Sequence, residues 1–279
     1  MTVVKHKKPD RWWRFRRLTL SRVAESLHDQ NLEIVFATSR DQYAEAFRLA
    51  HQRYLEAGII SPQPHGFWLT PYHILNDTRV VMAYLDGRPS CTASIVFDSA
   101  CGLPSDDIYR PELDVLRREG RRLAEFCSLA ALPALPARNT LFAVYRFLFR
   151  YAVSRGCTDI IISIRPKHAD FYTRILLFEE YGPLRSYPKF VDVQAILQRL
   201  EIAVATERLR RAYRDFPDEI NLYKFFITES IGDQEKQFAL AGALPKDDLD
   251  YFLARSCLWE KMPPAFQDYC RRQYGLQGA

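Results

Sequence analysis

The run from Thr158 to Tyr187, TDIIISIRPKHADFYTRILLFEEYGPLRSY, constrains the fold of this chain more than any other segment. Its three consecutive isoleucines at 160–162 are typical of a strand that is buried on both faces, most often a parallel strand inside a sheet. Pro166 suits the first turn of a helix, which we expect to continue to Gly182. The segment therefore predicts that Tyr172 lies one turn beyond the end of a central strand, where open α/β sheets bind their ligands.

The preceding residues alternate between strand and helix patterns. The expected elements are a strand at 33–39, a helix at 40–58, a β-hairpin about Asp86-Gly87, a strand at 122–131, and a helix that is capped by Asn139 and ends at Gly156. Between 61 and 78 lies the loop SPQPHGFWLTPYHILNDT, whose length and apolar content are typical of a lid or a pocket wall. The pattern indicates an α/β protein built as three layers.

The composition changes after Pro188. Asp192 is expected to cap a long helix with apolar residues on one face, and short helical segments separated by proline and glycine turns follow it. We therefore expect three parts: a basic, tryptophan-rich arm at 1–30, an α/β domain at 31–191 and a helical C-terminal extension at 192–279.

The net positive charge of the chain comes from the arm. Residues 1–30 contain eight Lys or Arg and three acids, which leaves 31 residues of each sign in the rest of the chain. A neutral body argues against a nucleic-acid-binding protein. The arm itself, with Trp12, Trp13 and Phe15, fits an interfacial anchor on anionic lipid. The favoured alternative is a solvated arm or a helix that packs on the domain.

Cysteine spacing and hydropathy indicate a cytoplasmic protein. The six cysteines include no C-x-x-C pair, and no histidine cluster has zinc spacing, so free thiols and no metal site are expected. No apolar run approaches the ~20 residues that span a bilayer. A peripheral contact with the inner membrane surface would arise only through the arm.

The segment FYTRILLFEEYGPLRSYP resembles the corresponding run of the long-chain N-acyl amino acid synthases, a family of the GNAT acyltransferase superfamily that is related to the autoinducer synthases. The resemblance covers roughly residues 33–195, and Leu177 departs from it where the family usually has glycine. It implies a GNAT-like three-layer mixed sheet with flanking helices. It also implies an enzyme that moves a long-chain fatty acyl group from acyl carrier protein to the α-amine of an amino acid.

Glu125 is the candidate general base. Amide formation needs a neutral amine, and a carboxylate within reach of the amine can take its proton. Glu125 is the only acid in the apolar strand RLAEFCSLAA, where burial would raise its pKa. The resemblance also places an acid on this strand, although Ser128 replaces the arginine of the autoinducer synthases' Glu-x-x-Arg pattern. The alternative is a structural glutamate that faces solvent or pairs with Arg121 or Arg122.

Tyr172 is the candidate general acid, because the resemblance implies a tyrosine that protonates the departing thiolate. The alternative is an ordinary core aromatic residue. Further candidates for substrate contacts are His168, Arg53, Tyr54 and Ser128. His168 also fits a simple role near the start of a helix. Phe142, Phe147, Phe149 and the segment 66–74 could hold the acyl chain or belong to the ordinary core.

The link 132–140, LPALPARNT, indicates which acyl donor the enzyme uses. It has two prolines and no glycine, so a backbone cradle for the pyrophosphate of coenzyme A is not expected. This favours the acyl-phosphopantetheine of acyl carrier protein as donor substrate, with no bound cofactor. Carrier proteins are acidic, and the candidate docking cluster is Arg117, Arg118, Arg121 and Arg122. The alternative for this cluster is a solvated helix end or loop.

Two other functions remain open at this point. Within the same fold, the enzyme could be a coenzyme A-dependent GNAT N-acyltransferase or resemble an autoinducer synthase. In a different class, it could be a non-catalytic membrane- or partner-binding module that uses the arm.

Overall fold

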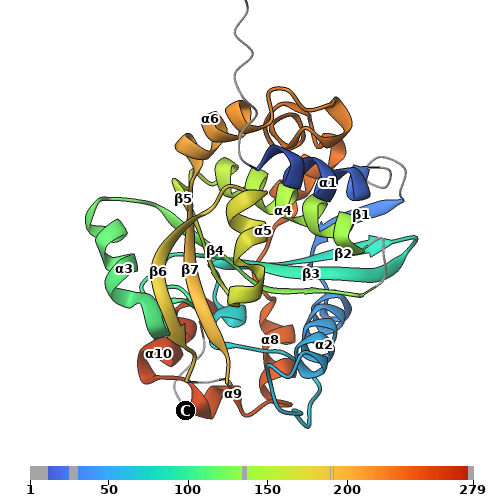
Figure 1. The fold of residues 1–279 in the computed structure, drawn as a ribbon. Coiled ribbons are helices and arrows are strands. Elements are labelled where there is room, and N and C mark those ends of the chain that lie inside the picture. The colour runs from blue at the N-terminus through green and yellow to red at the C-terminus, as the bar shows by residue number, and fades with distance from the viewer. Residues whose placement is uncertain (1–11, 25–30, 134–136, 189, 191, 276–279) are drawn as a thin grey trace, which may run out of the picture.

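A seven-stranded mixed sheet forms the centre of the protein (Figure 1). The computed structural model describes residues 12–24, 31–133, 137–188, 190 and 192–275. The strands are β1 Leu32–Phe36, β2 Thr78–Leu85, β3 Arg88–Phe97, β4 Leu123–Ala131, β5 Asp159–Ile164, β6 Glu179–Ser186 and β7 Gln194–Glu201. Their order is β1-β2-β3-β4-β5-β7-β6, in which β4 and β5 are parallel and the other neighbours are antiparallel.

Helices cover both faces of the sheet. The longer helices are α1 Trp13–Ala24, α2 Arg40–Glu56, α3 Asp106–Arg118, α4 Ala137–Ser154, α6 Ile202–Ala212, α8 Lys246–Leu253 and α10 Pro264–Tyr274. Shorter segments are η1 Pro71–Ile74, η2 Pro166–His168, α5 Ala169–Arg174, η3 Asp218–Ile220, the π-helix η4 Lys224–Thr228, η5 Gly232–Lys236, α7 Gln237–Leu240 and α9 Leu258–Lys261. In Figure 1, α1, α4, α5 and α6 lie above the sheet, α2 and α8 to α10 lie below it, and α3 lies beside β6.

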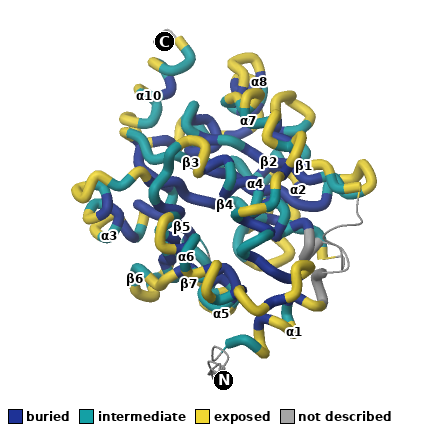
Figure 2. Tube along the Cα trace, turned by 90° about the horizontal axis from the view of Figure 1, so that it is seen from above, coloured by how far each residue is buried: buried dark blue, intermediate teal, exposed yellow. Residues whose placement is uncertain are grey.

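Two apolar cores result, one on each face. The first lies between the sheet and α4 to α6, and Phe147 and Ile160 are fully buried in it. The second lies between the sheet and α2, α3 and α8 to α10, and includes Phe47 and Phe252. Figure 2 shows the inner strands largely buried between helices whose outer sides are exposed, whereas the edge strand β6 has no buried residue. The chain after Glu201 contributes to both cores and so packs on both faces of the sheet.

Most elements of the first two thirds of the chain are confirmed. Ser39 and Gln42 form a capping box at the start of α2, which ends just before Gly58. The hairpin turns at Asp86-Gly87, and β5 is an internal strand that is parallel to β4. The mixed α/β sheet with flanking helices is the predicted fold class.

The helix predicted from Pro166 to Gly182 was wrong in its second half. α5 ends at Arg174, and β6 begins at Glu179. Leu177 lies between them with a φ of 62°, a left-handed conformation that an α-helix cannot contain. The spacing of the apolar residues continues through the break because Ile175 and Phe178 are both buried in the first core.

The helix predicted from Asp192 was also wrong in its first part, because residues 194–201 form β7 and the helical region begins at Ile202. β7 lies between β5 and β6 and buries residues on both faces, so it lacks the polar alternation of a half-exposed strand. The predicted cap at Asn139 was wrong as well, since α4 begins at Ala137. α3, which contains Pro111, was not expected at all.

The described part of the arm is a helix that packs on the domain. Leu20 is buried in the first core, and Trp13 lies 5.9 Å from Phe216, centroid to centroid. The guanidinium of Arg174 lies 3.8 Å from the ring centroid of Trp12. Residues 1–11 and 25–30 of the arm lie outside the described residues. Among the described helices, none is both long and apolar enough to cross a membrane.

Candidate active site

The edges of β4 and β5 separate at the centre of the sheet. The two strands pair over only three residues, Leu123–Glu125 with Asp159–Ile161, although each continues further. The register between β3 and β4 shifts between Thr92 and Ser94, and Ser128 has a φ of 52°. A β-bulge of this kind bends its strand away from a neighbour. A substrate between the separated strands, past Glu125 along β4, can therefore contact side chains from both faces of the sheet.

Glu125 lies at this point of separation and is 2% exposed. Ser105 donates both of its hydrogen bonds to it, the backbone N–H to Oε2 and the Oγ hydroxyl to Oε1, each at 2.8 Å. Burial raises the pKa of Glu125 to about 8, while the two hydrogen bonds from Ser105 act in the opposite direction. The alternative of a solvent-facing or arginine-paired glutamate is therefore wrong.

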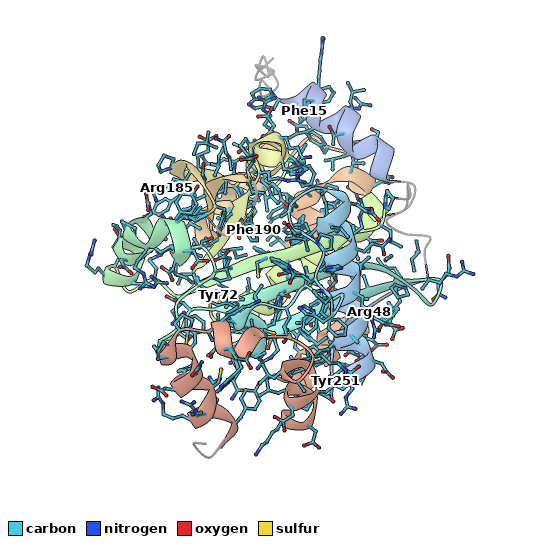
Figure 3. The ribbon with its side chains drawn as sticks, turned by 90° about the horizontal axis from the view of Figure 1, so that it is seen from below. Phe15, Arg48, Tyr72, Arg185, Phe190 and Tyr251 are labelled. Carbon is cyan, nitrogen blue, oxygen red and sulfur yellow. The ribbon has the colours of Figure 1, made fainter. Side chains whose placement is uncertain are left out.

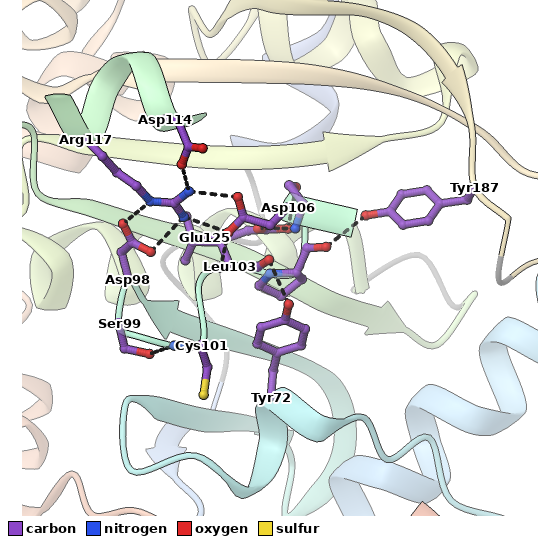
Figure 4. Close-up of polar contacts among 12 residues, drawn as sticks. Tyr72, Asp98, Ser99, Cys101, Leu103, Asp106, Asp114, Arg117, Glu125 and Tyr187 are labelled. Atoms are coloured by element: carbon purple, nitrogen blue, oxygen red, sulfur yellow. Dashed lines mark hydrogen bonds and ion pairs between the residues drawn. The ribbon is translucent and has the colours of Figure 1, made fainter. Parts of the chain in front are cut away.

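A polar network fixes the segment that carries Ser105 (Figure 4). Asp106 is almost fully buried and accepts a 2.7 Å hydrogen bond from the Leu103 N–H. The Arg117 guanidinium holds Asp106 together with Asp98 and Asp114, at 2.6 to 2.7 Å. Sequence reasoning missed Ser105, because it precedes a helix that was not expected and lies 20 residues from Glu125.

The four arginines of the proposed docking cluster do not form one free basic patch. Arg117 is held by three carboxylates, and Arg121 pairs with Asp159 at 2.6 Å and with Glu201 at 3.0 Å. Arg122 is exposed and donates from Nε to the Gly156 carbonyl, and Arg118 is exposed. Carrier-protein docking through this cluster stays a prediction that rests on its exposed members.

Tyr172 lies on the other face of the sheet, in the first core, and is 6% exposed. The Tyr145 hydroxyl donates a 2.6 Å hydrogen bond to the Tyr172 hydroxyl. Burial raises the pKa of Tyr172 to about 12, although the bond from Tyr145 lowers it. Tyr172 therefore keeps its proton at neutral pH, and it does not donate that proton to Tyr145, which is the donor of their hydrogen bond. Tyr145, on α4, was not predicted as a site residue.

Aromatic side chains surround the separated strand edges on the Glu125 side. Trp68 donates from Nε1 to Ser128 Oγ at 3.2 Å, and its ring lies 5.1 Å from that of Tyr54. Phe190, near the centre of the molecule in Figure 3, lies 5.7 Å from Trp68 and 5.1 Å from Tyr187. Trp68, Tyr187 and Phe190 were not predicted as site residues.

Electrostatic coupling connects this aromatic group to both candidate catalytic residues. Burial raises the pKa of Tyr54, and Cys127 and Tyr172 raise it further. Burial also raises the pKa of Tyr187, with Glu125 as the next cause. Tyr54 and Ser128 both contact Trp68, and their role in substrate binding stays a prediction.

Two other predicted substrate contacts are placed less directly. His168 is exposed at the start of α5, where its side chain makes no capping hydrogen bond. Arg53 pairs with Glu56 on the last turn of α2. Among the described contacts, neither side chain reaches Glu125 or Tyr172, and their role in binding stays a prediction.

A narrow apolar cavity begins beside the tyrosine pair. Its volume is about 20 Å³, room for a single water molecule, and no charged side chain lines it. Its lining residues are Phe126, Tyr145, Phe149, Ile160, Leu176, Phe178, Leu200, Leu209 and Phe226. Of the aromatics predicted for the acyl chain, Phe149 lines this cavity. Phe142 and Phe147 pack elsewhere in the first core, and the segment 66–74 packs in the second core.

This fold and site define an acyltransferase of the GNAT-like class, with a mixed sheet whose central strands separate beside a buried carboxylate and a tyrosine. The family model described as "N-acyl amino acid synthase FeeM" matches residues 45–201, and the chain belongs to that family. A comparison with curated protein sequences finds no match.

One solved structure agrees with this fold. FeeM, an N-acyl amino acid synthase from uncultured soil microbes, is 23% identical with a TM-score of 0.58, and the match covers 64% of this chain and 94% of that chain. The AHL synthase LasI is 14% identical with a TM-score of 0.47, and that match covers 63% of this chain and 93% of the other.

Proposed function

We propose that the enzyme transfers a long-chain fatty acyl group from the thioester of acyl carrier protein to the α-amine of an amino acid. One observation supports this most strongly. Glu125 is the last residue of β4 that pairs with β5 before the strands separate, and on the opposite face the Tyr145–Tyr172 pair packs against Phe126, the next residue of β4. A thioester in this gap would meet a base on one side and an acid on the other.

Glu125 would act on the amine, directly or through one water molecule. The amine nitrogen attacks the thioester carbonyl, the C–N bond forms, and the amine proton passes to the carboxylate. A base with a pKa of about 8 is well matched to this task, because a useful fraction is ionised near neutral pH and the conjugate acid forms readily. Ser105 would hold the carboxylate in place and stabilise its charged form.

Tyr172 would act on the leaving group. When the C–S bond breaks, the phenol proton passes to the thiolate sulfur, which regenerates a neutral thiol. Tyr145 already donates to the Tyr172 oxygen, and that hydrogen bond strengthens as negative charge develops on the phenolate. The acyl chain would extend along the apolar face beyond Tyr145, where the small cavity would have to widen to hold it.

Two features support acyl carrier protein as donor. The link 132–140 has no glycine, and the Leu132 N–H already donates to the Ser90 carbonyl at 2.9 Å, so it is not available to a phosphate. Residues 134–136 of this link lie outside the described residues. A phosphopantetheine arm needs no pyrophosphate cradle, and an acidic carrier protein would dock through exposed cations such as Arg118 and Arg122.

The test is a transfer assay with purified protein, in which acyl carrier protein and coenzyme A carry the same acyl chain and a mixture of amino acids is the acceptor. Mass spectrometry of the products is expected to show N-acyl amino acids, formed much faster from the carrier-protein donor. Equal rates from the two donors would contradict the donor assignment, and an absence of any acylated amine would contradict the function.

A further inference from the structure

We propose that Arg165 binds the α-carboxylate of the acceptor amino acid and so selects amino acids over other amines. This inference rests on the proposed function and names the residue that recognises its acceptor. Arg165 is the first residue after β5 and precedes Pro166, where η2 begins. Its backbone is extended, with a φ of −65° and a ψ of 141°. Arg165 therefore continues the line of β5 beyond the point where β4 and β5 separate.

The alternation of side chains along β5 places Arg165 on the same face of the sheet as Glu125. Glu125 pairs with Ile161 of β5, which belongs to the second core. Arg165 follows Ile161 by four residues, an even number, so it falls on the same face. Four residues of a strand span about 13 Å. The side chains of Glu125 and Arg165, with an amino acid between them, can bridge this distance.

The guanidinium of Arg165 lies close enough to Tyr54 of α2 to act on its phenol. Burial raises the pKa of Tyr54, and the positive charge of Arg165 lowers it. The Tyr54 ring packs on Trp68, which donates a hydrogen bond to Ser128 Oγ on β4. Ser128 follows Glu125 on the part of β4 that no longer pairs with β5. Arg165 therefore brings a positive charge from β5 to the side chains beyond Glu125.

Arg165 lacks a protein partner, in contrast to comparable arginines. Among the residues that the structure describes, it makes no hydrogen bond, ion pair or ring contact, although it is half-buried. Each other buried or half-buried arginine whose side chain is described makes at least one such contact. The acids nearest in sequence are engaged elsewhere, since Asp170 pairs with Arg174 and Asp159 with Arg121. A half-buried guanidinium gains most from a carboxylate, which accepts two of its hydrogen bonds at once.

The position of Arg165 favours the acceptor carboxylate over the phosphate of the donor arm. An amino acid carries its carboxylate one carbon away from its amine, so an amine held at Glu125 brings the carboxylate to the same face. The phosphate of phosphopantetheine lies at the opposite end of the arm from the sulfur. The neighbouring side chains supply no second buried cation. Burial lowers the pKa of His168, as do Arg165 and Lys167, and Lys167 is exposed.

The experiment measures transfer to each acylated amino acid and to its α-carboxamide, which keeps the amine and the side chain but has no negative charge. Wild type should show a kcat/KM about 100-fold higher for the acid, the scale of a charge-assisted pair of hydrogen bonds. Arg165→Ala should lower kcat/KM for the acid by about 100-fold, mainly through KM, and leave the value for the amide nearly unchanged. Arg165→Lys should restore part of the loss. Lys167→Ala, which removes an exposed cation of the same segment, is the matched control and should change neither value.

A second measurement uses the wild-type protein and does not depend on turnover. Phenylglyoxal modifies arginine side chains, and mass spectrometry follows the modification at each site. Free amino acids should slow the modification of Arg165 by about tenfold when they saturate the site, and their amides should not. The exposed Arg118 is the internal control and should react at one rate throughout.

The outcomes separate this inference from the proposed function. If free amino acids protect Arg165 but no acyl group is transferred, the carboxylate site stands and the proposed function fails. If N-acyl amino acids form while folded Arg165→Ala loses activity equally toward acid and amide, the carboxylate site is overturned and the function stands. A raised KM for acyl carrier protein with an unchanged KM for the amino acid would also overturn it, because Arg165 would then contact the donor. The same holds if no free amino acid protects Arg165.

Discussion

The hydroxyl of Tyr145 donates to the hydroxyl of Tyr172 over 2.6 Å, inside an apolar core on one face of the sheet. This geometry separates two roles that a single tyrosine would otherwise combine. In the proposed mechanism, Tyr172 gives its own proton to the leaving group and Tyr145 stabilises the charge that remains.

The first prediction distinguishes these roles. Tyr172→Phe should lower the rate by roughly 100-fold, because one hydrogen bond to the developing thiolate is lost. It should also lower the melting temperature by a few degrees, because the buried Tyr145 hydroxyl loses its acceptor. Tyr145→Phe should cost less, about tenfold, because Tyr172 becomes a weaker acid but remains present. Tyr109→Phe removes a buried hydroxyl that bonds to the Ala195 carbonyl and serves as the control.

An aryl thioester donor provides a check on this assignment. Its thiolate is less basic and needs less protonation, so both variants should recover activity relative to wild type. An equal loss with both donors would mean that Tyr172 positions the substrate and does not act as an acid.

The second prediction concerns Ser105, a positioning residue for Glu125. The enzyme should gain activity as the pH rises toward about 8, since the base works as a carboxylate and burial raises its pKa to that value. Ser105→Ala removes one hydrogen bond that favours the ionised carboxylate of Glu125. The rising part of the pH–rate profile should therefore move to higher pH. The rate at neutral pH should fall by about tenfold or more, the scale of a hydrogen bond to a charged group, and recover at higher pH.

Ser90→Ala is the matched control, because it removes a buried serine hydroxyl that bonds to the Ala83 carbonyl. The pH–rate profile is the deciding measurement. If the rate of Ser105→Ala rises over the same pH range as that of wild type, Ser105 does not affect the pKa of Glu125, even if the rate itself falls.

The third prediction follows from linkage. The pKa of Glu125 is raised from 4.5 to about 8 on folding, so between these values the folded state binds more protons than the unfolded state. The contribution of Glu125 to stability is therefore largest at low pH and declines as the pH rises through this window. Glu125→Gln should remove this decline, and urea unfolding at several pH values measures it. A wild-type slope in the variant would mean that Glu125 does not carry the shifted pKa.

The fourth prediction compares two neighbouring arginines. Arg117→Ala leaves the buried carboxylate of Asp106 without its cation and should lower the free energy of unfolding by roughly 3 kcal/mol. Arg118→Ala, an exposed change on the same helix end, should alter it by less than about 0.5 kcal/mol. Arg118→Ala should instead raise the apparent KM for acyl carrier protein if the exposed cations dock it. Equal stability of the two variants would contradict a structural role for Arg117.

Local pattern in the sequence predicted the elements that pack by simple rules. The isoleucines of β5, the helical pattern of α2 and the Asp86-Gly87 turn each carry their own signal. The sequence also identified Glu125 and Tyr172 as candidates, one as the lone acid of an apolar strand and one through family resemblance. Glu125 lies where β4 and β5 separate, and Tyr172 bonds to Tyr145, whose ring packs on the neighbouring Phe126.

The errors came from relationships that no local pattern contains. The break after α5 depends on Leu177 in a left-handed conformation, which its side chain does not favour. β7 is buried on both faces, and its apolar residues therefore fit a helix as well as a strand. The partners Ser105 and Tyr145 lie 20 and 27 residues from the groups that they contact, and only the folded chain brings them together.

The most direct test of the proposed activity is mass spectrometry of lipid extracts from a bacterial host that expresses the protein. Wild type should produce new long-chain N-acyl amino acids, and a matched strain that expresses folded Glu125→Gln should produce roughly 100-fold less. The acylated amino acid and the chain length would be read from the same spectra. If abundant, folded wild-type protein yields no new N-acyl amino acid, or if Glu125→Gln yields as much as wild type, the proposed function or its mechanism is contradicted.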